Sequence, residues 1–255
     1  MIENPKVIIN YKKMSEEPYL SVVIPAYKEE KRIHKILDAI IDYEKNHDFK
    51  IEVIVVLDGT PDNTAQAAEK YQERIKKLKI IDRRVNKGKG YTVKEGMLAA
   101  RGEYILFTDA DNATPIKQVD KLLEFVDDYQ VIIGSRYVKG GKLAVPQGIF
   151  RKIGGRGLNW IIRILAVPGI IDTQCGFKLF QHNAAKEIFK RITFDRWSFD
   201  IEALAIARRH KYKIKEVGIT WYNDPHSLVS PIKDGLKMVR DAWVVRKNLK
   251  EGIYK

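Results

Sequence analysis

Short apolar runs separated by helix-length segments constrain the fold of this chain more than any other feature. The stretch from Ile51 to Leu57 is continuous and rich in β-branched residues, which is typical of a strand buried on both faces of a parallel sheet. Similar runs lie at 20–24 (ended by Pro25), 78–82, 104–108 and 131–135. Helical patterns lie between them near 33–41, 88–101 and 115–128. The alternation predicts an α/β fold with a mostly parallel twisted sheet, helices on both faces, and a site at the carboxyl ends of the strands.

The second half of the chain has weaker strand signals. A segment rich in glycine, arginine and large apolar residues (140–170) is followed by an expected turn over Asp172 to Phe177. Further elements are expected as helices near 183–192 and 197–210, a strand at 214–221, and a final helix from about 231. Because no change in composition marks a linker, we expect an N-terminal extension (1–19), one domain (20–230) and a C-terminal amphipathic helix (231–255).

The net charge of the chain is strongly positive. Forty-six Lys and Arg against 33 Asp and Glu give +13, which indicates an anionic partner such as nucleotide phosphates, nucleic acid or an anionic membrane. The single cysteine, Cys175, excludes an internal disulfide and fits a reducing compartment. No uncharged apolar stretch approaches the ~18 residues of a membrane-spanning helix, so no transmembrane helix is predicted.

Candidate site residues follow the ends of the predicted strands. They are Tyr27, Asp58, Lys89, Asp109, Asp111 and Arg136. Asp109 and Asp111 stand one residue apart after an apolar run, so both carboxylates can reach one divalent cation. Mg²⁺ and Mn²⁺ are commonly bound in this way together with substrate phosphates. The alternative is a loop in which the two aspartates only cap turns and the next helix.

Basic and acidic groups elsewhere add to this candidate site. In Asn86–Val93 two glycines allow the backbone to approach a ligand, and Lys89 adds charge at a helix start, where anions bind. The alternative is a solvated turn with surface lysines. Arg136 carries a guanidinium fork that suits phosphate oxygens, unless it is an ordinary surface arginine. Asp200, near a helix start, is a general base, an acceptor-positioning group, or an acid that satisfies the helix dipole.

Two stretches combine apolar side chains, tryptophan and basic residues. They are residues 148–167, which include Trp160, and residues 231–250, which include Trp243. Basic amphipathic helices with tryptophan lie at bilayer interfaces, so the pair favours a peripheral, monotopic protein on an anionic membrane. Packing of both stripes onto the sheet is the ordinary alternative.

Several motifs, taken in order and spacing, resemble one known family. The segments Leu20–Glu29, Asp58–Thr64, Asn86–Gly90 and Asp109–Asp111 resemble inverting family-2 glycosyltransferases of the GT-A nucleotide-sugar transferase fold. Asp172–Phe180 and Arg196–Glu202 resemble the dolichyl-phosphate β-glucosyltransferases, to which the dolichyl-phosphate mannose synthases are a sister family. The resemblance implies a GT-A catalytic domain over 20–230 with an interfacial segment at about 146–170.

The resemblance also implies a role for each matching position. The nucleotide pocket would be lined by Pro25, Ala26, Tyr27, Glu29, Asp58, Lys89 and Asp109. Asp111 and Asp109 would hold Mg²⁺ or Mn²⁺, and Asp200 and Arg136 would be the catalytic residues. The acceptor phosphate would be met by Ser135, Arg136, Arg151, Asn159, Trp221 and Ser227. Two positions depart from the family: Leu57 stands where an acid is frequent, and Ala113 where some mannose synthases carry a glutamine metal ligand.

The expected activity is metal-dependent transfer of a hexose, with inversion, from a nucleotide sugar to dolichyl or another polyprenyl phosphate at the cytoplasmic face of a membrane. UDP-glucose is the favoured donor and GDP-mannose the alternative. A phosphate acceptor is already ionised near neutral pH and needs no strong base; with a lipid-linked sugar hydroxyl as acceptor, Asp200 would be the base. A nucleic-acid-binding domain would also explain the charge. The sequence carries no zinc-finger pattern, RNP-like strand or basic recognition helix, so no nucleic-acid partner is expected.

Overall fold

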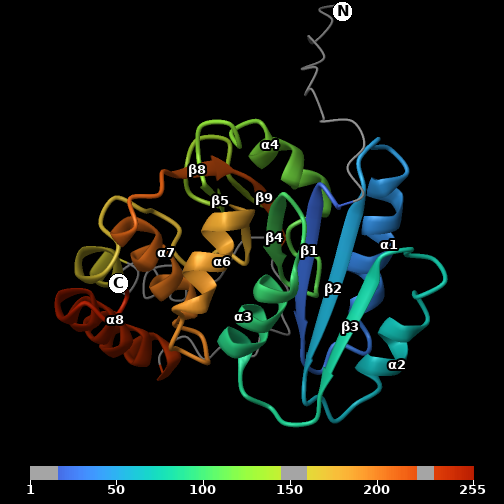
Figure 1. The fold of residues 1–255 in the computed structure, drawn as a ribbon, viewed down its shortest axis with the longest axis horizontal. Helices are drawn as coiled ribbons and strands as arrows, with labels where there is room; N and C mark the ends of the chain where they lie inside the picture. Colours follow the sequence, from blue (N-terminus) through green and yellow to red (C-terminus); the bar gives the residue numbers. More distant parts are fainter. Residues whose placement is uncertain (1–16, 145–159, 223–232) are drawn as a thin grey trace, which may run out of the picture.

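A computed structural model describes residues 17–144, 160–222 and 233–255 of the chain. Its centre is a seven-stranded sheet in the order β3-β2-β1-β4-β7-β5-β8 (Figure 1). The strands are β1 (Leu20–Ala26), β2 (Ile51–Asp58), β3 (Leu78–Arg83), β4 (Tyr104–Thr108), β5 (Val131–Ser135), β7 (Phe177–Gln181) and β8 (Ile214–Gly218). All neighbouring pairs are parallel except the two that involve β7. The α/β, mostly parallel architecture expected from the sequence is confirmed.

The central strands are buried along their whole length, because helices cover both faces of the sheet. Strand β1 runs to Ala26, so the expectation that Pro25 ends it is wrong. Its pairing with β4 stops where Val23 lies opposite Phe107, and beyond that point β1 pairs only with β2. Pro25 therefore stands where one edge of the strand is unpaired, and the missing N–H of proline is tolerated there.

Strand β7 was not expected from the sequence. It runs antiparallel between β4 and β5, with Lys178 opposite Phe107 of β4 and Ile133 of β5. The expected turn over Asp172 to Phe177 leads straight into it. Because β7 enters at the edge where the parallel strands end, it brings residues 175–178 next to the candidate site.

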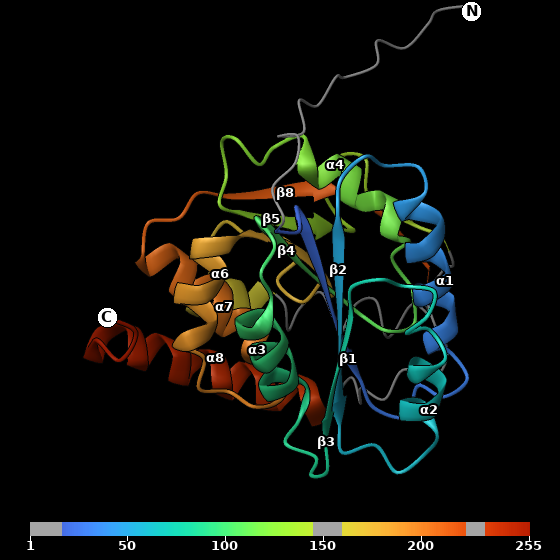
Figure 2. The same cartoon turned by 45° about the vertical axis from the view of Figure 1, so that its right-hand side comes forward.

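The helices form a layer on each face of the sheet. They are α1 (Ile33–Glu44), α2 (Thr64–Glu69), α3 (Lys89–Ala99), α4 (Val119–Leu123), α6 (His182–Lys190), α7 (Phe199–Arg209) and α8 (Lys233–Glu251). Figure 2 shows α1, α2 and α4 on one side and α3, α6 and α7 on the other, with α8 packed outside α7. Helix α3 lies close to the sheet because Gly96 faces it: a Cβ there would stand 2.4 Å from Cγ1 of Val23.

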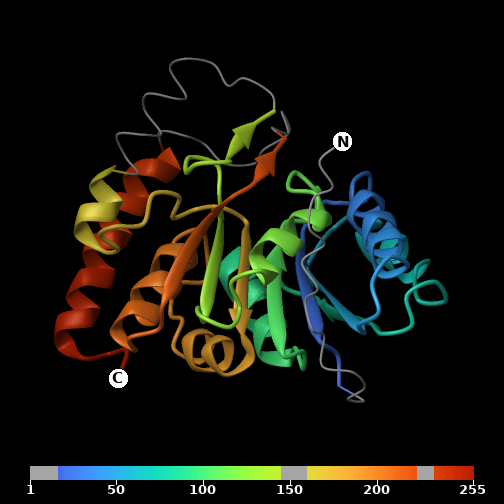
Figure 3. The same cartoon turned by 90° about the horizontal axis from the view of Figure 1, so that it is seen from above.

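Two expected elements are divided in the structure. The helix expected over 115–128 is a 3-10 turn, η1 (Ile116–Gln118), followed by the short α4. After α4 the N–H groups of Phe125, Val126 and Asp128 bond three residues back rather than four. The strand expected over 214–221 ends at Gly218 as β8. A second piece, β9 (Thr220–Trp221), pairs with β6 (Lys142–Leu143) in a separate two-stranded sheet (Figure 3). The division carries Trp221 away from the main sheet and towards the end of β5.

Helix α8 forms the outer layer on one side of the molecule. Met238, Ala242 and Val245 on its inner face are buried. Leu236 and Trp243 on its outer face are 64% and 62% exposed. Both Figure 1 and Figure 3 place the short helix formed by residues 160–165 beside α8.

The helix at 160–165 has the same division of faces. Ile162 is buried, whereas Trp160, Ile161 and Ile164 are exposed. Among the described residues, no helix combines the length and the apolar content needed to cross a bilayer. Both neighbouring helices therefore expose apolar side chains to the surface.

Candidate active site

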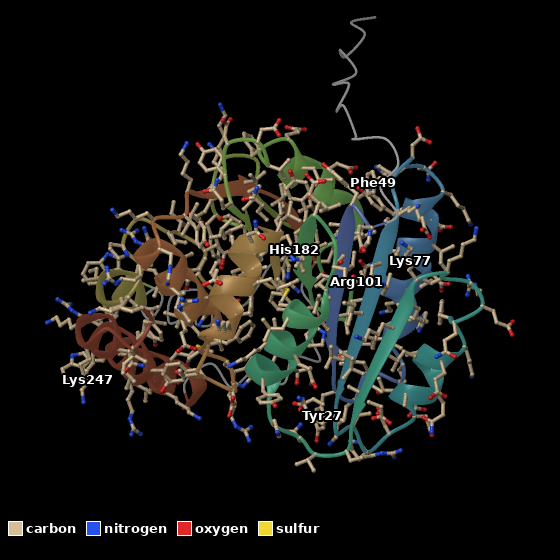
Figure 4. All side chains as sticks on the ribbon, in the orientation of Figure 1. Tyr27, Phe49, Lys77, Arg101, His182 and Lys247 are labelled. Atoms are coloured by element: carbon tan, nitrogen blue, oxygen red, sulfur yellow. The ribbon has the colours of Figure 1, made fainter. Side chains whose placement is uncertain are left out.

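The loops after β1 and β2 are tied together at the carboxyl edge of the sheet. The hydroxyl oxygens of Thr60 and Thr64 accept hydrogen bonds at 2.9 Å from the backbone N–H groups of Lys28 and Glu29. Both hydroxyls in turn donate to the Asp62 carboxylate, at 2.5 and 2.6 Å. Tyr27, which starts the first loop, lies at this end of the sheet in Figure 4, whereas Arg101 lies towards the other end. Pro25 and Ala26, predicted to line the nucleotide pocket, are the last residues of β1 leading into this loop.

Asp58 holds the turn that starts α3. Its buried carboxylate accepts hydrogen bonds from the backbone N–H groups of Lys87 (2.8 Å) and Gly88 (2.9 Å). The guanidinium of Arg83 donates to the same carboxylate at 2.6 Å. Gly88 has a φ of +101°, a conformation that favours glycine. Asp58 therefore fixes a glycine turn at the start of α3, a helix start where anions are favoured.

Lys89 and Asp109 form an ion pair across the site. Nζ of Lys89 lies 2.6 Å from Oδ1 of Asp109 and 5.4 Å from the centroid of the Trp197 ring. Burial lowers the pKa of Lys89, but the carboxylates of Asp109 and Asp200 raise it, and the net shift is upward. The ammonium group is therefore a fixed positive charge close to both carboxylates.

The carboxylates of Asp109 and Asp111, after β4, and of Glu29, in the first loop, are near enough to influence one another's pKa. Burial, and then the charge of Asp109, raise the pKa of Asp111. Burial raises the pKa of Glu29 to about 7, although Arg32 donates to both of its oxygens at 2.7 and 2.8 Å. The charges of Asp111 and Asp109 add to the upward shift of Glu29. An added cation would relieve this concentration of negative charge.

The oxygen atoms around Asp111 supply some of the ligands that Mg²⁺ or Mn²⁺ requires. The side-chain oxygen Oδ1 of Asn112 is buried and has no hydrogen-bond partner among the described residues, so an acceptor there is unused. Asn112 also has a φ of +56°, in the left-handed region. No group of three or more acidic, histidine or cysteine side chains within 17–144, 160–222 and 233–255 could hold a metal ion. Two aspartates with only oxygen ligands suit a hard cation that takes its remaining ligands from phosphates and water.

Arg136 is held by Asp172. Nε and Nη2 of the guanidinium lie 2.8 and 2.7 Å from the two oxygens of the carboxylate, and the backbone N–H of Arg136 donates to it at 2.9 Å. Backbone N–H groups at 171 and 172 donate to Glu216 of β8, which fixes Asp172 in turn. The guanidinium carbon lies 5.3 Å from the centroids of the Tyr137 and Trp221 rings. The remaining nitrogen, Nη1, has no hydrogen-bond partner among the described residues and can serve a phosphate oxygen.

Asp200 is paired with a lysine that the sequence did not single out. Nζ of Lys178, a β7 residue that is 1% exposed, lies 2.5 Å from Oδ1 of Asp200 and 2.5 Å from the carbonyl oxygen of Cys175. Burial raises the pKa of Asp200, while the charges of Lys178 and Lys89 lower it. A short apolar strand seldom carries a buried lysine, and no periodicity in the sequence distinguishes Lys178 from a surface lysine.

Gly176 lies against Asp109. A Cβ at Gly176 would stand 2.0 Å from Oδ2 of Asp109, and the backbone N–H of Asp109 donates to the Gly176 carbonyl at 3.3 Å. The segment 175–178 therefore contacts Asp109 through Gly176 and Asp200 through Lys178. The sequence analysis placed Gly176 in a family-like motif but assigned it no role.

The remaining expected site residues are placed less centrally. Ser135 is fully buried at the end of β5, and its backbone oxygen accepts from the N–H of Ile219. Arg151, Asn159 and Ser227 lie outside the described residues. The structure thus brings together Glu29, Asp58, Lys89, Asp109, Asp111, Arg136, Asp200 and Trp221 at the carboxyl edge of the sheet.

Comparison with known proteins identifies the family of this site. Residues 21–189 match the model of glycosyl transferase family 2. The chain belongs to this family. Within the family, the transferase is 37% identical to a dolichyl-phosphate beta-glucosyltransferase of Trichomonas vaginalis, over 97% of this chain and 80% of that protein. It is 35% identical to the dolichyl-phosphate beta-glucosyltransferase of Homo sapiens (92% and 77%) and 33% identical to that of Saccharomyces cerevisiae (97% and 80%).

Solved structures share the fold of the transferase. Glucosyl-3-phosphoglycerate synthase from Mycobacterium tuberculosis, in complex with phosphoglyceric acid, superimposes with a TM-score of 0.64 at 19% identity, over 90% of this chain and 80% of that one. S. aureus TarS in complex with UDP-GlcNAc gives 0.55 at 20% identity, over 92% and 71%. At these identities the likeness concerns the fold alone. The expected family and fold are confirmed, whereas the roles assigned to individual site residues stay predictions.

We expect Gly176→Ala to reduce glycosyl transfer by roughly 100-fold, because the new methyl group displaces the Asp109 carboxylate from its place opposite Lys89. Initial rates measured below the melting temperature of the variant test this. Gly102→Ala is the matched control: its Cβ would stand 2.6 Å from the backbone nitrogen of Ser21, near the start of β1 and far from the site. It should lower stability without a comparable loss of rate. Equal rates for Gly176→Ala and the unchanged chain would show that Asp109 need not be held in this place.

Proposed function

We propose that this glycosyltransferase transfers glucose from UDP-glucose to dolichyl phosphate or another polyprenyl phosphate, with inversion at the anomeric carbon. The observation that carries the proposal is the 33–37% identity to dolichyl-phosphate beta-glucosyltransferases over 92–97% of the chain. This similarity extends beyond residue 189, where the match to the family model ends, and so includes the half of the site that contains Asp200 and Trp221.

The arrangement of charges supports a phosphate acceptor. In the proposed step an acceptor phosphate oxygen forms a bond to the anomeric carbon as the bond to the UDP oxygen breaks. A phosphate monoester is already anionic, so the step needs no base. Arg136, with Nη1 outside its ion pair with Asp172 and with the rings of Tyr137 and Trp221 nearby, would hold the acceptor phosphate. Asp200, paired with Lys178, would accept a hydrogen bond from a sugar hydroxyl rather than remove a proton.

We further propose that Asp111 and Asp109 hold Mg²⁺ or Mn²⁺ beside the donor diphosphate. The raised pKa of Asp111 and the unused oxygen of Asn112 support a cation in this place. Bound there, the ion would neutralise the negative charge that develops on the leaving diphosphate. Lys89 would add a second positive charge on the side of α3.

The exposed apolar side chains support a peripheral membrane location. Leu236 and Trp243 lie on the outer face of α8 among the basic residues Lys237, Arg240, Arg246, Lys247 and Lys250. Figure 4 shows Lys247 pointing outward from this helix. Val239, which lies between Leu236 and Trp243 on the same helix, packs partly against the core. The membrane-facing surface that we propose therefore consists of Leu236 and Trp243 on α8 with Trp160, Ile161 and Ile164 beside it.

The donor and acceptor are tested together with purified protein, Mn²⁺ and a short polyprenyl phosphate. With UDP-glucose we expect a lipid product heavier by one hexosyl unit, because the relatives that carry the proposal are glucosyltransferases. GDP-mannose is the parallel arm, and mass spectrometry of the lipid is the measurement. Transfer from GDP-mannose alone would make the chain a mannosyltransferase. Transfer to a free sugar but not to the lipid phosphate would contradict the proposed acceptor.

Removal of the metal should stop transfer. We expect chelation with EDTA to abolish activity reversibly, and Asp111→Asn to reduce it by roughly 100-fold, because the neutral amide is a poor ligand for a hard cation. Asp38→Asn is the control, since Asp38 lies on α1 and pairs with Arg74. Transfer rates before and after readdition of Mg²⁺ or Mn²⁺ give the result. Full activity in chelator would remove the metal from this mechanism.

Membrane binding should depend on the exposed side chains of α8. We expect the double variant Leu236→Ser, Trp243→Ser to bind anionic vesicles at least roughly tenfold more weakly, because each apolar side chain contributes when it leaves water. Binding of the unchanged chain should weaken with added salt. Leu98→Ser, an exposed leucine of α3, is the control in the same flotation assay. Equal flotation of the double variant and the unchanged chain would show that α8 does not face the lipid.

A further inference from the structure

Glu202 is a buried carboxylate that the proposed reaction does not use. It lies on α7 and has no solvent exposure. Its oxygens accept hydrogen bonds from the backbone N–H of Thr193 (2.9 Å), the hydroxyl of Thr193 (2.6 Å) and the backbone N–H of Phe194 (2.9 Å). A buried charge is stable only with several donors of this kind, so Glu202 and residues 193–194 hold one another in place.

The segment that Glu202 holds is the surface on which the α3 turn rests. A Cβ at Gly88 would stand 2.5 Å from the carbonyl oxygen of Asp195, and one at Gly90 would stand 2.3 Å from that of Phe194. The backbone N–H of Tyr91 donates to the Asp195 carbonyl at 3.1 Å. The start of α3 is therefore in direct contact with residues 194–195.

The same segment continues to the side chain of Lys89. Trp197 follows it, and its ring centroid lies 5.4 Å from Nζ of Lys89. Lys94, one turn further along α3, donates to the carbonyl of Ile192 at 2.8 Å. The segment 192–197 thus supports α3 from its first residue through its second turn, and it contacts the group that faces the Asp109 carboxylate.

A fourth donor to Glu202 comes from the end of the chain. The hydroxyl of Tyr254, which is 1% exposed, donates to Oε1 of Glu202 at 2.8 Å. Burial, and then the charge of Glu202, raise the pKa of Tyr254, so the phenol stays a neutral donor. Asn248 of α8 donates to the same hydroxyl at 3.0 Å. The carboxylate therefore joins the region that follows α8 to the support of the α3 turn.

We propose that Glu202 is a positioning residue for the nucleotide, and that Tyr254 contributes to this positioning through its hydrogen bond to Glu202. Glu202 sets the segment 193–197, this segment sets the turn Gly88–Gly90, and the turn directs Lys89 and its backbone N–H groups at the diphosphate. The inference rests on the proposed function in one respect, namely that this turn binds a nucleoside diphosphate. Neither Glu202 nor Tyr254 touches the substrate.

The test is binding of UDP in the presence of Mg²⁺, measured by calorimetry on the full chain. Tyr254→Phe keeps the buried ring and removes one donor to the carboxylate, so we expect the Kd for UDP to rise roughly threefold to tenfold. In Glu202→Gln the amide oxygen can still accept from the N–H groups of Thr193 and Phe194, but the amide NH₂ then faces the hydroxyls of Thr193 and Tyr254 and the negative charge is lost, so we expect a larger rise. The KM for the polyprenyl phosphate should stay unchanged in Tyr254→Phe, since Arg136, which we propose for the acceptor phosphate, is held by Asp172 rather than by Glu202.

His210→Gln is the matched control. Nε2 of His210 lies 2.8 Å from the carbonyl oxygen of Tyr254, so the variant weakens the attachment of the same turn without altering the contact with Glu202. We expect it to lower the melting temperature about as much as Tyr254→Phe and to bind UDP as the unchanged chain does.

The outcomes separate this inference from the proposed function. Equal UDP affinity for the unchanged chain, Tyr254→Phe and folded Glu202→Gln would overturn the inference and leave the transferase proposal standing. An equal loss of affinity in His210→Gln would show that the turn after α8 acts only through stability, which also overturns it. Failure of the unchanged chain to bind UDP or GDP would contradict the proposed function and, with it, this inference.

Discussion

Because β7 runs antiparallel between β4 and β5, the chain crosses the carboxyl edge of the sheet at Cys175 and Gly176, next to Asp109. Most of the site depends on this crossing. It leaves no room for a side chain beside the Asp109 carboxylate, and it buries Lys178 opposite Asp200. Asp109 and Asp200 are therefore held in place by residues 176–178, although neither aspartate lies on β7. A parallel strand in the same place would enter at the other edge and would bring its first residues to the wrong end of the sheet.

The site consists largely of charges that are already paired within the protein. Arg83 pairs with Asp58, Lys89 with Asp109, Arg136 with Asp172, and Lys178 with Asp200. Buried charges need such partners, since a buried charge without one is strongly destabilising. The pairing also fixes each group before a substrate binds, which is the condition under which fixed charges stabilise a transition state. The charges around Asp111 do not balance, because the three carboxylates of Glu29, Asp109 and Asp111 stand against the two cations Arg32 and Lys89, and this excess of negative charge supports a bound cation.

Helix α7 contacts both the candidate site and helix α8, the two regions on which the proposed activity depends. Its first turn carries Asp200 at the site, Ser198 donates to Asp241 of α8 at 2.5 Å, and Glu202 holds the support of the α3 turn. Helix α8, with its exposed Trp243, is thus packed on the same element that shapes the proposed donor side. A membrane-facing surface in this place would lie one helix away from the nucleotide, which suits an acceptor whose phosphate must leave the bilayer while its polyprenyl chain stays in it.

The sequence by itself determined the α/β class, the order of most strands and helices, and the family, because periodicity and turn residues are local properties of the chain. It also placed Asp58, Lys89, Asp109 and Arg136 at strand ends, where parallel strands must bring them to one edge. Only the tertiary structure decided which charges pair, since Lys178 and Asp200, or Arg136 and Asp172, are far apart in the chain. The direction of β7, the support that Glu202 and Tyr254 give to the α3 turn, and the partial burial of Val239 beside exposed Trp243 were likewise decided by packing. A helical period shows that a stripe is apolar, but the neighbouring elements determine which part of it is covered.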